Sequence, residues 1–141
     1  MRLYVDTSYA LSLFIEDALT VRAQEWLLGL EGAELTCSTW TLTEFSAAAA
    51  RYQRTGDLSM ADVGGAEHAF AEWVAETVRM VELQPQDGRR ALQLVRDPQH
   101  TLAGPDALHI AIAERLGSGV LTFDKQMRRA ALAIGAIVEP A

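Results

Sequence analysis

Short runs of apolar residues alternate along this chain with longer segments whose apolar residues recur at helical intervals. Runs such as RLYV at residues 2–5 and ELTC at 34–37 have the length of buried strands. Strands that alternate with helices form a parallel sheet with right-handed crossovers and helices on both faces. The pattern therefore predicts an α/β fold, in which ligands bind at the edge where the strands end.

The expected elements follow from this alternation and from the positions of Gly and Pro. The strands are expected at residues 2–5, 34–37, 79–85 and 136–140, and a strand followed by a turn is expected at 118–124. The helices are expected to begin at residue 7 and to cover 19–30, 38–54, 58–78, 86–96, 105–117 and 125–135. Pro85 is expected to end the third strand. Since there is no repeat, low-complexity tract or linker, we expect one domain over residues 1–141.

Composition places the chain among ordinary globular proteins, with 50% hydrophobic and 22% charged residues. No apolar run approaches the roughly 20 residues that a membrane helix needs. The first residues, MRLYVDTS, lack the apolar stretch of a signal peptide. The lone Cys37 cannot form an internal disulfide and is expected to be buried and inert. We therefore expect a cytoplasmic protein.

Four acidic residues stand where such a sheet presents its binding edge. Asp6 and Asp124 directly follow apolar runs. Asp106 begins a helix, and Glu44 lies one to two turns into another. Four carboxylates at one edge would repel one another and raise some of their pKa values unless cations intervene. Because Mg²⁺ takes hard oxygen ligands, the set predicts a metal site.

Each of these residues also has a structural explanation. Asp6 and Asp124 could cap the helices that follow them, and Asp106 could complement a helix macrodipole. Glu44 could complete a capping box with Thr41. The sequence leaves these roles open beside the metal-binding one.

The segments that carry the acids resemble those of the PIN-domain ribonucleases, in particular the VapC-like toxins of bacterial and archaeal toxin–antitoxin pairs. The resemblance runs from VDTSYAL through TEF to PDALHIAIA and LTFDKQM, and so covers nearly the whole chain. DALHIAIA followed shortly by LTFD is its most specific part. It implies a single PIN-like domain, built as a three-layer α/β/α sandwich around a mostly parallel sheet of four to five strands.

The resemblance implies a metal-dependent endoribonuclease toxin. It carries over the acids as the catalytic and metal-binding set, namely Asp6, Glu44, Asp106 and Asp124. Ser8 and Thr122 match hydroxyl positions of the motifs and are given a supporting role through hydrogen bonds to a carboxylate or a metal-bound water. The expected cofactor is Mg²⁺, with Mn²⁺ as a substitute, which activates water for attack on an RNA phosphodiester. The products would carry 5′-phosphate and 3′-hydroxyl ends.

The expected partners are the RNA substrate and a cognate antitoxin, in a homodimer or a toxin–antitoxin hetero-oligomer. The net charge of −7 does not favour RNA binding, but 11 of the 12 basic residues are Arg, which suits phosphate contacts. Lys125 and Arg128 flank Asp124 and are the predicted RNA contacts. Tyr52 and the helix at 19–30 are the candidate surface for the antitoxin. Arg51 is grouped with the remaining basic residues as a solvated side chain.

Two histidines near the acidic motifs have different interpretations. His109 lies in the apolar DALHIAIA segment, which favours a hydrogen-bonded core histidine over a general base. His100 precedes that helix in an expected loop, and the sequence does not decide its role.

Other functions remain as alternatives. A catalytically silent PIN-like module that only binds RNA or protein would keep the fold without metal-dependent cleavage. A structure-specific DNA nuclease would use the same acids on a branched duplex, for which a chain of 141 residues offers few additional elements to grip the branch. A phosphatase of the haloacid dehalogenase type fits poorly, because it needs a second Asp where Ser8 stands.

Overall fold

The computed structural model describes residues 1–141 and contains five strands and seven helices. The strands are β1 (Arg2–Val5), β2 (Glu34–Ser38), β3 (Val78–Val81), β4 (Gly119–Leu121) and β5 (Val138–Glu139). The helices are α1 (Thr7–Phe14), α2 (Thr20–Leu28), α3 (Thr39–Thr55), α4 (Met60–Thr77), α5 (Pro85–Arg96), α6 (Gly104–Leu116) and α7 (Lys125–Ala133). None of these helices is both long enough and apolar enough to cross a membrane.

The five strands form one sheet in the order β3-β2-β1-β4-β5, and every neighbouring pair is parallel. The first half of the chain adds β2 and β3 on one side of β1, and the second half adds β4 and β5 on the other. The topological switch point therefore lies between β1 and β4, where Val5 is in register with Leu121. A crevice at the carboxyl ends of these two strands is the usual ligand site of such a sheet.

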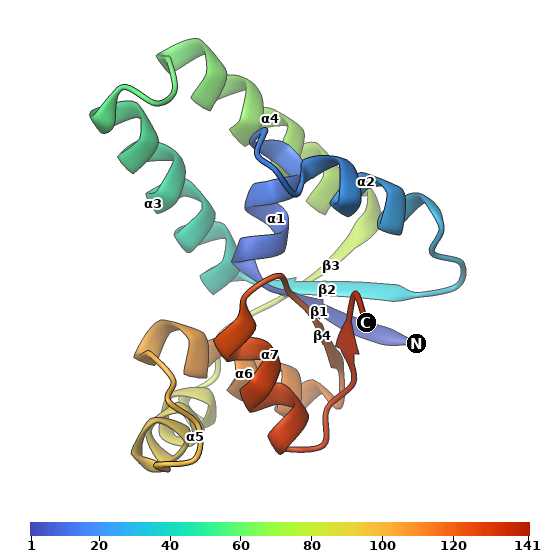
Figure 1. Ribbon diagram of the computed structural model, residues 1–141, viewed down its shortest axis with the longest axis vertical. Coiled ribbons are helices and arrows are strands. Elements are labelled where there is room, and N and C mark those ends of the chain that lie inside the picture. Colours follow the sequence, from blue (N-terminus) through green and yellow to red (C-terminus); the bar gives the residue numbers. More distant parts are fainter.

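Helices cover both faces of the sheet, as Figure 1 shows: α1 to α4 lie on one side and α5 to α7 on the other. The side chains of β1 alternate between two cores, because successive residues of a strand point to opposite faces. Leu3 and Val5 pack with Phe45 and other residues of the first helical layer. Tyr4 packs with Ile110 and other residues of the second. This arrangement confirms the expected three-layer α/β/α sandwich.

The ends of several elements follow local sequence signals. Gly56 and Gly117 end α3 and α6 in the left-handed conformation that glycine adopts without strain. The prediction that Pro85 ends a strand was wrong: β3 stops at Val81, and Pro85 is the first residue of α5. Proline at the first helical position loses no hydrogen bond, because that N–H has no partner within the helix. The final strand is shorter than expected and holds only Val138 and Glu139.

Gly119 in β4 marks a close approach between backbones, which gives a test of the sheet packing. A Cβ at this position would lie 2.9 Å from the carbonyl oxygen of Ile137 and 3.0 Å from Cδ2 of Leu3. We expect Gly119→Ala to lower the free energy of unfolding by about 1–3 kcal/mol, because the backbone oxygen cannot move aside freely. The control is Gly64→Ala in α4, where nothing lies within 4 Å of the new Cβ. The Gly64→Ala variant should have a free energy of unfolding up to about 1 kcal/mol higher, because alanine has the greater helix propensity. Urea unfolding of both variants measures the two changes.

Candidate active site

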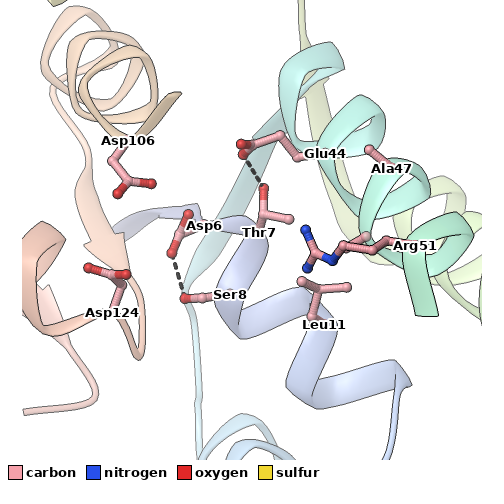
Figure 2. A pocket seen from close by; sticks show the side chains of 10 residues that line it. Asp6, Thr7, Ser8, Leu11, Glu44, Ala47, Arg51, Asp106 and Asp124 are labelled. Carbon is pink, nitrogen blue, oxygen red and sulfur yellow. Dashed lines mark hydrogen bonds between the residues drawn. The ribbon is translucent and has the colours of Figure 1, made fainter. Parts of the chain in front are cut away.

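A pocket of about 280 Å³ opens at the switch point, and it brings together the four predicted acids. Asp6 follows β1, Glu44 lies on α3, Asp106 lies in the first turn of α6, and Asp124 precedes α7. Figure 2 shows the side chains of Asp6, Asp106 and Asp124 on one side of the pocket and Glu44 on the other. The lining is completed by Thr7, Ser8, Leu11, Ala47, Ala48 and Arg51.

Asp6 is held by two hydroxyl groups. Its Oδ2 accepts hydrogen bonds from Ser8 Oγ at 2.5 Å and from Thr122 Oγ1 at 2.7 Å. Its backbone N–H donates to the carbonyl of Leu121 at 3.0 Å, which ties the end of β1 to β4. Although Asp6 is the N-cap residue of α1, its carboxylate caps no backbone N–H, so the helix-cap explanation was wrong for this side chain. Ser8 and Thr122 therefore make the hydrogen bonds to a carboxylate that were predicted for them.

Asp124 does act as a helix cap. Its Oδ1 accepts a hydrogen bond from the backbone N–H of Met127 at 2.8 Å, in the first turn of α7. Its own N–H donates to Thr122 Oγ1 at 3.0 Å. The cap fixes the carboxylate beside the pocket, and Oδ2 makes no hydrogen bond within the protein. Capping and pocket lining are therefore compatible roles for this residue.

Glu44 has no part in the cap of α3, so the predicted Thr41–Glu44 capping box was wrong. Ser38 is the N-cap residue and Thr41 is the third helical residue, and these two form the box. Glu44 lies three residues further on, where it accepts hydrogen bonds from Thr7 Oγ1 at 2.9 Å and from His109 Nε2. Burial opposes ionisation of Glu44, but the hydrogen bond and charge of His109, with the Thr7 bond, lower its pKa below the ordinary value.

The negative charges of the other carboxylates in the pocket act on Asp106. Partial burial, followed by the charges of Asp124 and Asp6, raises its pKa from 3.8 to about 6. The nearby His109 and Glu44 have smaller, opposing effects on this pKa. A cation in the pocket would stabilise the ionised form of Asp106 and lower its raised pKa.

The donor set fits a hard divalent cation. Asp6, Glu44, Asp106 and Asp124 offer only carboxylate oxygens, the ligands that Mg²⁺ prefers, and no thiol or amine lines the pocket. No three acidic, histidine or cysteine side chains of the structure converge closely enough to hold an ion together. Binding of a cation by this set would therefore require the carboxylates to move closer to one another.

The raised pKa of Asp106 leads to a prediction about stability without metal. Ionising this group costs the folded state more than the unfolded one, so stability should fall as pH rises from about 4 to 6. Asp106→Asn removes that charge, and we expect it to stabilise the metal-free protein at neutral pH by about 1–2 kcal/mol after solvent screening. Thermal unfolding in EDTA at several pH values checks this result. A variant no more stable than the wild type at neutral pH would contradict it.

Arg51 lines the pocket, although the sequence grouped it with the solvated basic residues. The sequence contains one signal for this position. Arg51 lies seven residues after Glu44, and two helical turns put both residues on the same face of α3. Ala47 and Ala48 lie between them and leave room for the pocket.

The other predicted basic contacts lie outside the pocket. Lys125 is exposed at the start of α7, and the guanidinium of Arg128 donates to the carbonyl of Pro140. His100 does not reach the pocket either. Its Nε2 lies 3.4 Å from a carboxylate oxygen of Asp97, and its buried Nδ1 has no hydrogen-bond partner.

His109 is fully buried and hydrogen-bonded, as the sequence predicted, but its partner was not foreseen. It contacts Glu44, which lies 65 residues earlier in the chain. No local pattern indicates a contact between residues so far apart.

Comparison with known proteins identifies the family of the chain. A family model described as PIN domain matches residues 3–132. A search of curated protein sequences finds no match.

Several solved structures share the fold at low sequence identity. VapC20 of Mycobacterium tuberculosis, a toxin that cleaves the sarcin–ricin loop, is 20% identical over 96% of both chains, with a TM-score of 0.73. A toxin–antitoxin complex from Klebsiella pneumoniae is 18% identical over 99% of this chain and 98% of that one, with a TM-score of 0.69. VapBC-1 of nontypeable Haemophilus influenzae is 16% identical over 99% and 97%, with a TM-score of 0.66. Because the family model spans nearly the whole chain, this protein belongs to the PIN-domain family.

Proposed function

We propose that this protein is a divalent-metal-dependent endoribonuclease in which all 141 residues form a single PIN-like domain. The observation that carries the proposal is the pocket at the switch point, where four carboxylates from four separate segments meet. Membership of the PIN-domain family supports the nuclease class.

The roles of the site residues follow from their contacts. Asp6, Glu44, Asp106 and Asp124 would hold Mg²⁺, with Mn²⁺ as a substitute. When bound there, a divalent cation would lower the pKa of a water molecule and polarise a phosphate oxygen. Ser8 and Thr122 orient Asp6 through Oδ2.

Basic residues around the pocket would bind the RNA backbone. Arg51 lines the pocket and offers a guanidinium for phosphate oxygens. Lys125 is exposed beside Asp124 and is a second proposed RNA contact. Arg128 remains a weaker proposal, because its guanidinium already contacts the carbonyl of Pro140.

We further propose that the enzyme is a cytoplasmic toxin whose activity a cognate antitoxin inhibits, in a homodimer or hetero-oligomer. The proposal is supported by the toxin–antitoxin complexes among proteins of this fold. A second pocket, of about 240 Å³, lies beside the first and shares Leu11 with it. Apolar Ile15 and Leu58 line this second pocket together with Tyr52, one of the residues proposed for the antitoxin.

A cleavage assay tests this function. The purified protein is incubated with a mixture of labelled total cellular RNA and, separately, with branched and linear DNA, in Mg²⁺, Mn²⁺ or EDTA. We expect RNA fragments with 5′-phosphate ends in either metal, and none in EDTA. Cleavage that continues undiminished in EDTA would contradict the metal-dependent mechanism. Cleavage of DNA but not of RNA would show that the substrate is DNA.

A further inference from the structure

His109 connects the core of the protein to the candidate active site. It lies on α6, three residues after Asp106, and its side chain is completely buried. It lies between Tyr4 of β1, with ring centroids 5.6 Å apart, and Glu44 of α3. A buried imidazole needs a partner for each ring nitrogen inside the protein.

Each nitrogen of the ring has a distinct set of neighbours. Nδ1 lies 2.7 Å from the hydroxyl oxygen of Tyr4. Nε2 contacts Oε1 of Glu44, and lies 3.1 Å from Thr7 Oγ1 and 3.8 Å from Oδ1 of Asp6. The side of the ring that carries Nε2 therefore faces the carboxylates, and the opposite side faces the core.

The hydrogen-bond network determines where the proton lies. An ionised Glu44 can only accept hydrogen bonds, so the proton in the contact with His109 must be on Nε2. In the neutral ring Nδ1 is then an acceptor, and the Tyr4 hydroxyl can donate to it. Ser38 Oγ lies 2.7 Å and Thr41 Oγ1 3.2 Å from the same hydroxyl oxygen, and either can supply the hydrogen bond that this oxygen accepts.

The two bonds to Glu44 use the same oxygen. Thr7 and His109 both donate to Oε1, and Oε2 makes no hydrogen bond within the protein. A carboxylate held in this way has one oxygen fixed by the fold and the other free for a ligand. Groups that orient metal ligands by hydrogen bonds in this manner typically change metal affinity by about 10–100-fold when they are removed.

We propose that His109 is a positioning residue that holds Glu44 through an Nε2–H hydrogen bond and leaves Oε2 for a cation, while Tyr4 pairs with Nδ1. The effect on a metal rests on the proposed metal-dependent function, but the hydrogen bond can be tested independently of that function. A histidine that only filled the core would place no proton toward Glu44.

Nitrogen-15 NMR of the metal-free wild type tests the hydrogen bond without RNA, metal or mutation. The chain has three histidines, and His68→Gln and His100→Gln assign the other two spectra. At about pH 8, where an ordinary histidine is neutral, we expect a slowly exchanging proton on Nε2 of His109. The ring proton of His68, which is exposed although its Nε2 lies 3.0 Å from Oε1 of Glu72, should exchange rapidly with solvent. An unprotonated Nε2 on His109, or a proton there that exchanges as fast as that of His68, would overturn the proposal.

Two variant sets test the consequence for the metal. Tyr4→Phe keeps the aromatic ring and removes the partner of Nδ1, whereas the Nε2 proton should persist because Glu44 still accepts it. His109→Leu should weaken Mn²⁺ binding by about 10–100-fold, whereas His109→Gln, whose amide can still donate to Glu44, should retain most of the affinity. His100→Leu is the control, because His100 lies outside the pocket.

If His109→Leu binds Mn²⁺ as tightly as the wild type, the positioning role is wrong. If the wild type binds no Mn²⁺, the proposed function fails, but the NMR result still tests the hydrogen bond.

Discussion

Replacing Asp106, a proposed metal ligand, by asparagine is expected to reduce RNA cleavage by at least about 100-fold, because loss of a ligand should cost more than loss of an outer hydrogen bond. The amide has nearly the shape of the carboxylate but carries no charge. The measurement is the initial rate of fragment formation in Mg²⁺, with the wild type and the variant at equal concentration. Since the same substitution is expected to stabilise the protein without metal, thermal unfolding of the variant separates a loss of activity from a loss of folding.

The matched control is Glu76→Gln, an exposed residue of α4 outside the pocket. It removes one negative charge at a distance from the site, so its cleavage rate should stay within about twofold of the wild-type rate, since distant surface charges are screened by salt. Near-full activity of Asp106→Asn would remove this residue from the catalytic set. Equal losses in both variants would show that the effect of Asp106→Asn does not depend on its place in the pocket.

Replacing Arg115 by methionine is expected to lower the free energy of unfolding by about 3 kcal/mol, because it leaves a buried carboxylate without its positively charged partner. Asp87 is only 1% exposed. Arg115 donates to it twice, from Nε at 2.7 Å and from a terminal nitrogen at 3.0 Å, and so links α6 to α5. Urea unfolding of the purified variant measures the change.

A second ion pair between the same two helices provides the control. Arg90 on α5 contacts Glu114 on α6 at 2.7 Å, but both side chains are more than a third exposed. Arg90→Met should therefore cost less than about 1 kcal/mol. Adding Asp87→Asn to Arg115→Met should recover part of the loss, since the amide buries no charge. Equal effects at Arg90 and Arg115 would show that burial of Asp87 does not govern the stability of this interface.

The sequence predicted the order of strands and helices because those signals are local. Apolar runs, helical spacing, and caps such as Gly56 and Gly117 depend on neighbours within a few residues. Errors arose where two local signals competed. Pro85 was assigned to the end of a strand, although proline is equally suited to the first turn of a helix, as in α5.

The site was predictable in part for a related reason. In a parallel sheet, the residues after β1 and β4 must lie at one edge, so the sequence alone was enough to place Asp6 and Asp124 together. The contact between His109 and Glu44 was not predictable, because it depends on how α6 packs against α3 and β1. The side-chain cap of Asp6 was also wrong, since hydroxyls brought by the fold and by its own helix engage that carboxylate instead.

Mn²⁺ binding by calorimetry, with the wild type and Asp6→Asn compared near neutral pH, tests the central claim that the four acids hold a divalent cation. It needs no knowledge of the RNA target, and circular dichroism shows whether both proteins are folded. We predict that the wild type binds Mn²⁺ and that the folded variant binds it at least about 10-fold more weakly. A wild type that binds no Mn²⁺ at millimolar concentration, or a variant that binds it equally well, would contradict the claim.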